Sequence, residues 1–157
     1  MNWPYIHTLI NHFPIVLSVV GTAAVLLAAI TGRRGAWLFA LATLTLAGLS
    51  VYPADMTGDQ ASHALRGVWY IVPAAVREHD QAATFGLLSL LITGVASAYA
   101  WWRLLTRDAA TGLPRWLRIG VVVLALWSAS VIARVGYLGG RIIHDSPKLV
   151  NSSGPPS

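Results

Sequence analysis

Four apolar stretches dominate the chain and restrict what it can fold into. Each has about 17–23 residues, which is the length needed to cross ~30 Å of hydrocarbon as a helix. They cover residues 13–30, 36–52, 82–102 and 116–138. Only 11% of the residues are charged and the mean hydropathy is +0.60, whereas a soluble domain has about 25% charged residues. The pattern predicts an all-α integral membrane protein: a four-transmembrane-helix up-down bundle in a lipid bilayer, with no nucleic-acid partner.

The distribution of charge predicts the orientation. The two short links, after the first and third stretches, hold six arginines and one acid, whereas the rest of the chain holds five basic and five acidic residues. Arginine-rich short loops stay in the cytoplasm. Both termini are therefore expected on the periplasmic side of a bacterial inner membrane, as parts of a multi-pass protein. The amino terminus lacks the basic region of a cleavable signal peptide, so the first stretch is expected to be retained.

Pro53 predicts the end of the second helix, which leaves a long outer segment from Pro53 to Arg77. Within it, residues 65–72 are apolar but too short to span, and they indicate either an interfacial helix with Trp69 and Tyr70 at the headgroups or a plain loop. The tail 147–157 is polar and predicts a flexible periplasmic segment after a transmembrane domain of residues 1–146. No cysteine is present, which excludes disulfides, thiolate metal sites and covalently attached haem.

All histidines fall on the predicted outer side, at positions 7, 12, 63, 79 and 144. His12, His79 and His144 can reach similar depth from three helices, which is how bundles build cofactor sites. Imidazole is the usual axial ligand of haem iron. Each histidine also has an ordinary interpretation: His7 as an interfacial residue, His63 as a loop residue in solvent, and the others as helix-end residues.

A b-type haem also needs a flat apolar slot and cations for its propionates. Small residues around Gly140 let a flat ring approach the backbone. Arg66, Arg77 and Arg141 lie near the histidines in sequence and are candidates to meet the carboxylates. Arg134 lies inside the apolar stretch, where a charge is costly, and shares one face with Arg141 and, within about 80°, with Tyr137 and His144. It is a candidate to bind a propionate, Asp55 or a quinone headgroup, and the alternative is that it snorkels to the interface.

Four short segments resemble, in order, a family of bacterial four-helix membrane proteins of unknown function. They are 7–17 (HTLINHFPIVL), 57–61 (TGDQA), 78–82 (EHDQA) and 136–144 (GYLGGRIIH). The resemblance implies a small membrane cytochrome with b-type haem, with His12 and His79 as ligands and His144 as a further candidate. The chain departs from the family pattern at Thr8, where the family often has proline, and at Tyr137, where it often has histidine.

These observations favour a haem b electron-transfer subunit that is not catalytic by itself. His12 and His79 would hold one haem, and His144 with His7 or His63 a second. Such a protein would exchange electrons near the outer face between quinone and a periplasmic c-type cytochrome or dehydrogenase subunit. The alternatives are a cofactor-free structural subunit of a larger membrane complex and a metal or proton transporter. The absence of acids inside the apolar stretches argues against the transporter.

Overall fold

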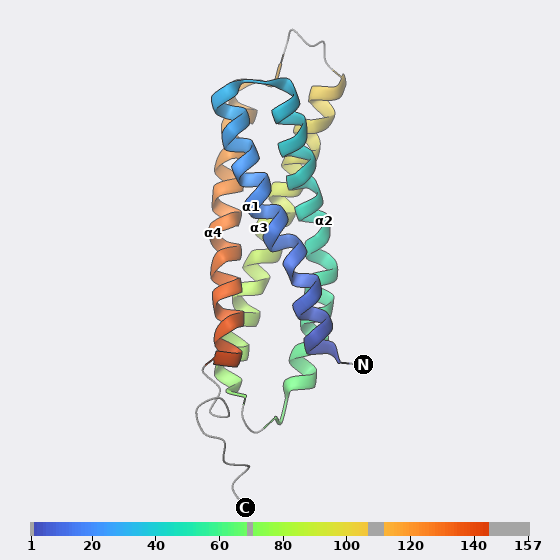
Figure 1. Cartoon of the computed structure of the whole chain (residues 1–157), viewed down its shortest axis with the longest axis vertical. Helices are drawn as coiled ribbons and strands as arrows, with labels where there is room; N and C mark the ends of the chain where they lie inside the picture. Colours follow the sequence, from blue (N-terminus) through green and yellow to red (C-terminus); the bar gives the residue numbers. More distant parts are fainter. Residues whose placement is uncertain (1, 69–70, 107–111, 145–157) are drawn as a thin grey trace, which may run out of the picture.

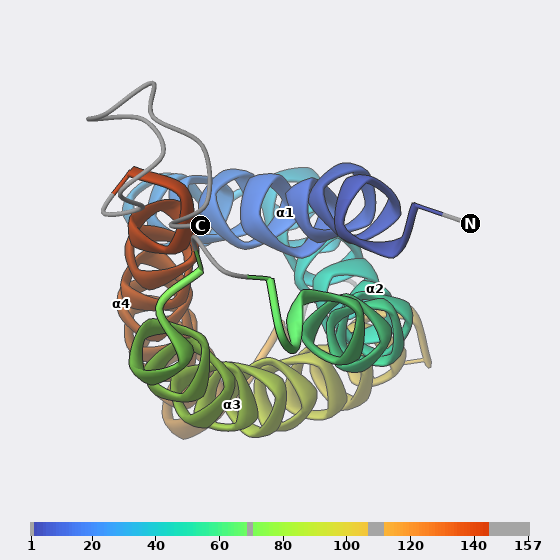
Figure 2. The same ribbon diagram turned by 90° about the horizontal axis from the view of Figure 1, so that it is seen from below.

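The computed structural model describes residues 2–68, 71–106 and 112–144 and confirms the four-helix bundle (Figure 1). Its helices are α1 (Trp3–Thr31), α2 (Arg34–Leu65), α3 (Pro73–Thr106) and α4 (Arg115–His144). All four are long and apolar enough to cross a membrane. Each helix packs on the next and α4 closes the ring against α1, so α1 lies diagonally opposite α3 (Figure 2).

The two ends of the bundle differ in what they hold. The start of α1, the end of α4 and the α2–α3 connection lie together at one end, here called the terminal end (Figure 1). The opposite end holds the α1–α2 turn and the start of α4, with Arg33, Arg34, Arg115 and Arg118, and is here called the arginine end. This arrangement puts the start of α1 and the end of α4 at the same end of the bundle.

The helices are longer than the sequence predicted, at 29, 32, 34 and 30 residues. α1 begins at Trp3 because the Asn2 side chain accepts a hydrogen bond from the Tyr5 backbone N–H at 3.3 Å, and Pro4 fits the first turn. The predicted end at Pro53 is wrong, since α2 continues through that proline to Leu65. Prolines are tolerated in membrane helices because neighbouring helices satisfy the freed carbonyl.

The predicted outer loop from Pro53 to Arg77 is therefore wrong. Most of that segment is helical, and only residues 66–72 connect α2 to α3. The predicted interfacial helix at 65–72 is also wrong for the described residues, which form a turn in which Gly67 has φ of 80°. That left-handed conformation ends helical geometry. Trp69, Tyr70 and the tail 147–157 lie outside the described residues.

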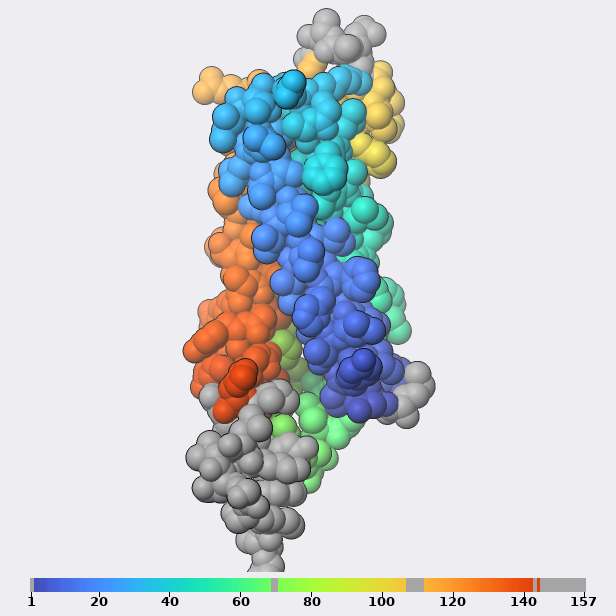
Figure 3. Space-filling model, viewed as in Figure 1, coloured from blue at the N-terminus to red at the C-terminus, as the bar shows by residue number. Residues whose placement is uncertain are grey.

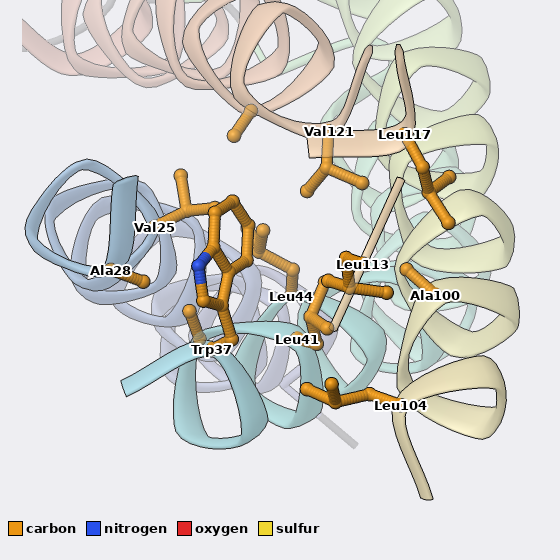
Figure 4. Close-up of a cluster of buried hydrophobic side chains, with 12 residues drawn as sticks. Val25, Ala28, Trp37, Leu41, Leu44, Ala100, Leu104, Leu113, Leu117 and Val121 are labelled. Atoms are coloured by element: carbon orange, nitrogen blue, oxygen red, sulfur yellow. The ribbon is translucent and has the colours of Figure 1, made fainter. Parts of the chain in front are cut away.

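The core is densest near the arginine end. One cluster of twelve buried residues, drawn from all four helices and from Leu113, two residues before α4, fills this half of the bundle (Figure 4). Its indole, Trp37, is 4% exposed and lies beside Val25 and Ala28 of α1. A second cluster, toward the terminal end, consists of Ala47, Val51, Leu90 and Ile132. The apolar core therefore becomes thinner toward the terminal end.

Small residues bring the helices close together in the middle of the bundle. A Cβ on Gly48 of α2 would lie 2.8 Å from the Gly94 Cα of α3, so the two backbones touch. Buried hydroxyls add contacts between helices: Thr22 donates to the Ala125 carbonyl at 3.2 Å and Thr93 to the Leu124 carbonyl at 3.3 Å. Close backbone approach and hydroxyl–carbonyl bonds are the usual stabilising contacts between membrane helices, where lipid is as apolar as leucine.

Candidate functional site

Two histidines from diagonal helices face each other at the terminal end. The ring of His7 on α1 and the ring of His79 on α3 have centroids 6.5 Å apart and planes inclined by 71°. Both rings are partly buried. Two imidazoles that each bind one metal from opposite sides, at about 2 Å per bond, place their centroids about 6 Å apart. The observed separation therefore suits two ligands of a shared metal.

Each ring is oriented by a backbone carbonyl of the neighbouring helix. His7 Nδ1 lies 3.1 Å from the Ala54 oxygen on α2, with Thr57 Oγ1 at 3.3 Å, and His79 Nδ1 lies 3.2 Å from the Val135 oxygen on α4. A carbonyl oxygen only accepts, so Nδ1 must donate in both rings. In the neutral ring the lone pair then belongs to Nε2. An Nδ1–H bond to a carbonyl is the usual way in which a metal-binding histidine is held.

Each ring also packs on a glycine one turn beyond that carbonyl. A Cβ on Gly58 would lie 3.1 Å from Cε1 and 3.8 Å from Nε2 of His7, and a Cβ on Gly139 would lie at the same 3.1 Å and 3.8 Å from His79. The α1–α2 and α3–α4 hairpins thus build the same half-site, related by an approximate two-fold axis along the bundle. Gly139, rather than the predicted Gly140, makes the close approach, since no described residue lies within 4 Å of a Cβ on Gly140.

A periodic pattern identifies both histidines. The buried positions of α1 include 14, 18, 21, 25 and 28, and those of α3 include 86, 90, 93, 97, 100 and 104. Extending each series backward by alternate steps of three and four residues reaches His7 and His79. Residues with this spacing share one face of a helix. The same two series are offset by 72 residues, which agrees with the repeated half-site.

Asn11, one turn below His7 on the same face, is a further site residue that the sequence did not indicate. Its Oδ1 is buried and has no hydrogen-bond partner among the described residues. An unpaired buried amide is costly. Its position points to a polar or cofactor contact inside the bundle. The signal that could have found it is the four-residue spacing from His7.

His12 is placed differently from the prediction. It is exposed, and its Nδ1 contacts the Thr8 carbonyl oxygen of its own helix. His7 and His12 are five residues apart, hence about 140° apart around the helix, so that only one of them can face the bundle. The ring that the structure brings to His79 is His7.

The other predicted ligands and contacts lie on the outside of the bundle. His63 is in the last turn of α2, and His144 is the last residue of α4; both are exposed. Tyr137 is 68% exposed, and Arg134 is exposed on α4 one residue before the carbonyl that orients His79. The structure does not bring these four side chains to the histidine pair.

The remaining predicted arginines lie at the terminal end. Arg141 forms an ion pair with Glu78 at 3.8 Å, across α4 and α3. Arg66 and Arg77 line a cavity of about 490 Å³ between the end of α2 and the start of α3. Asp80, the residue after His79, lines the same cavity. Arg66, Arg77 and Arg141 therefore lie at the same end of the bundle as the histidine pair.

The donor set indicates which kind of metal centre fits. Among the described residues, no group of three or more His, Cys, Asp or Glu side chains is placed to hold a metal ion. Two imidazoles alone are too few for a bare zinc or copper ion, which takes three or four protein ligands. They are the full protein contribution to a six-coordinate haem, whose macrocycle supplies the other four nitrogens.

The surroundings of the pair also fit such a group. The apolar core is thin at this level, a glycine packs on each ring, and the Asn11 Oδ1 has no hydrogen-bond partner in the part of the chain that the structure describes. Between α1 and α4 in the terminal half, part of α3 is visible on the molecular surface (Figure 3). No family model, curated protein or solved structure matches the chain.

Proposed function

We propose that the chain is a membrane-embedded electron-transfer subunit that holds one b-type haem between His7 and His79. The observation that carries this proposal is the repeated half-site: two facing imidazoles, each oriented through Nδ1 and each packed on a glycine. Such a haem exchanges single electrons and, with both axial positions filled, offers no site for substrate chemistry. The resemblance of four short segments to a family of bacterial four-helix membrane proteins of unknown function, which implies b-type haem, supports the same assignment.

The depth of the histidine pair in the bilayer supports electron exchange at one face of the membrane. Arg118 and Arg134 bracket the apolar part of α4 and are sixteen residues, about 24 Å, apart. Their side chains can snorkel outward, so about 30 Å of hydrocarbon fits between them. The carbonyl that orients His79 follows Arg134, so the pair lies at the boundary of the hydrocarbon. We therefore infer electron exchange between quinone and a periplasmic c-type cytochrome or dehydrogenase subunit.

The protein purified from a haem-producing host is expected to be red. Its Soret band should shift on reduction, with the sharp α and β bands of a six-coordinate, low-spin iron. Extraction with acidified organic solvent should release the group, since no cysteine can attach it covalently. A colourless protein from haem-replete cells would contradict the proposal and favour a cofactor-free structural subunit.

The proposal includes an orientation with the terminal end in the periplasm of a bacterial inner membrane. The chain has no cysteine, so single cysteines can report it. A cysteine at exposed Gln60, near the terminal end, should react with a membrane-impermeant maleimide in intact cells. A cysteine at exposed Gly35, in the arginine end, should react only after permeabilisation. The reverse labelling pattern would place the histidine pair at the cytoplasmic face.

A further inference from the structure

The cavity between the end of α2 and the start of α3 combines apolar walls with a few polar groups. Its volume is about 490 Å³, within the ~300–1,000 Å³ typical of small-molecule sites. Leu65, Val68, Ile71 and Val76 supply the apolar surface, while Arg66, Arg77 and Asp80 supply charge. We propose that this cavity binds the headgroup of a membrane quinone.

The polar groups have the donors and acceptors that such a ring needs. Ser62 donates to Asp80 Oδ1 at 2.9 Å, which fixes the carboxylate between α2 and α3. The second carboxylate oxygen can accept the hydroxyl of a hydroquinone. Neither Arg66 nor Arg77 has an acidic partner within the described ranges, so both guanidinium groups can donate to a quinone oxygen. The two guanidinium donors suit the oxidised headgroup, and the carboxylate acceptor suits the reduced one.

The location suits an amphiphilic ligand that comes from the bilayer. The cavity lies at the terminal end, where the helices leave the hydrocarbon, and its lining joins polar groups to apolar side chains. Asp80 follows His79 directly in α3, so the cavity is adjacent to the histidine pair. The biological meaning of this site rests on the proposed redox function, but binding itself can be measured without haem.

The test uses the full chain in nanodiscs of zwitterionic lipid, with decylubiquinone as the probe and tryptophan fluorescence quenching as the readout. Arg77→Gln and Asp80→Asn are expected to weaken binding by about tenfold or more, which is the loss of a charge-assisted hydrogen bond. Arg118→Gln, a matched change at the arginine end, should leave it unchanged. The double variant His7→Ala/His79→Ala should still bind the probe, which separates this site from the haem proposal.

Two results would overturn the assignment. Equal affinity in Arg77→Gln, Asp80→Asn and the unmodified chain would place quinone binding elsewhere. Loss of probe binding when phosphatidylglycerol is added to the nanodisc would assign the two arginines to an anionic lipid headgroup. A cavity-filling change, Val76→Phe, should abolish binding while the Soret band persists if the cavity is the site.

Discussion

Replacing His7 or His79 with alanine is expected to remove at least nine-tenths of the haem from the purified protein. Each ring supplies one of two axial bonds, so its loss costs more than the ~1.4 kcal/mol that a tenfold change in affinity represents. The measurement is the ratio of Soret absorbance to protein absorbance after purification. His79→Gly in the presence of free imidazole should recover part of the band, because the small ligand can occupy the space left by the side chain.

The matched control is His12→Ala, five residues from His7 on the same helix. Because His12 is exposed and its Nδ1 contacts the Thr8 carbonyl oxygen of its own helix, the variant should keep the full Soret band. His63→Ala and His144→Ala should also keep it. A colourless His12→Ala protein beside a red His7→Ala protein would reverse the ligand assignment.

Gly58→Leu and Gly139→Leu are expected to expel the haem to a similar degree. A Cβ at either glycine meets a histidine Cε1 at 3.1 Å, which is tighter than normal contact, and the remaining leucine atoms would displace the ring. The smaller changes to alanine should weaken haem retention by about tenfold each. The measurement is the rate of haem transfer to a soluble haem acceptor.

Two other glycines of α4 provide the controls. A Cβ on Gly136 meets its nearest neighbour among the described residues at 3.9 Å, and one on Gly140 meets none of them within 4 Å. Alanine at either position should leave haem transfer unchanged. Unequal effects of Gly58→Ala and Gly139→Ala would argue against the approximate two-fold symmetry of the site, even if the ligand pair is correct.

The number of helices could be predicted from the sequence, but their lengths could not. Hydropathy marks only the part of a helix that lipid covers. The helical turns that extend beyond the apolar stretches, at the end of α2 and the start of α3, contain four acidic residues: Asp55, Asp59, Glu78 and Asp80. Hydropathy alone assigns such residues to loops. Pro53 strengthened that interpretation, although one lost hydrogen bond does not end a helix that is packed on its neighbours.

The structure brings His79 together with His7, whereas resemblance and an assumed start of the first helix near residue 13 favoured His12 as its partner. That His79 binds a cofactor stays a prediction. With α1 beginning at Trp3, His7 lies in phase with the buried positions and His12 does not. The contacts to the Ala54 and Val135 carbonyls depend on how the helices pair, and no spacing within one helix contains that information.

The thin core at the terminal end has a consequence for how the protein matures. The twelve-residue cluster can hold the hairpins together through one half of the bundle, while the other half has few apolar contacts of its own. For the proposed haem, this means that insertion and assembly could be complete before the haem arrives, and that its loading would require only that the helix turns at the terminal end separate. Maturation would proceed from the membrane surface inward, without unfolding of the part that anchors the chain.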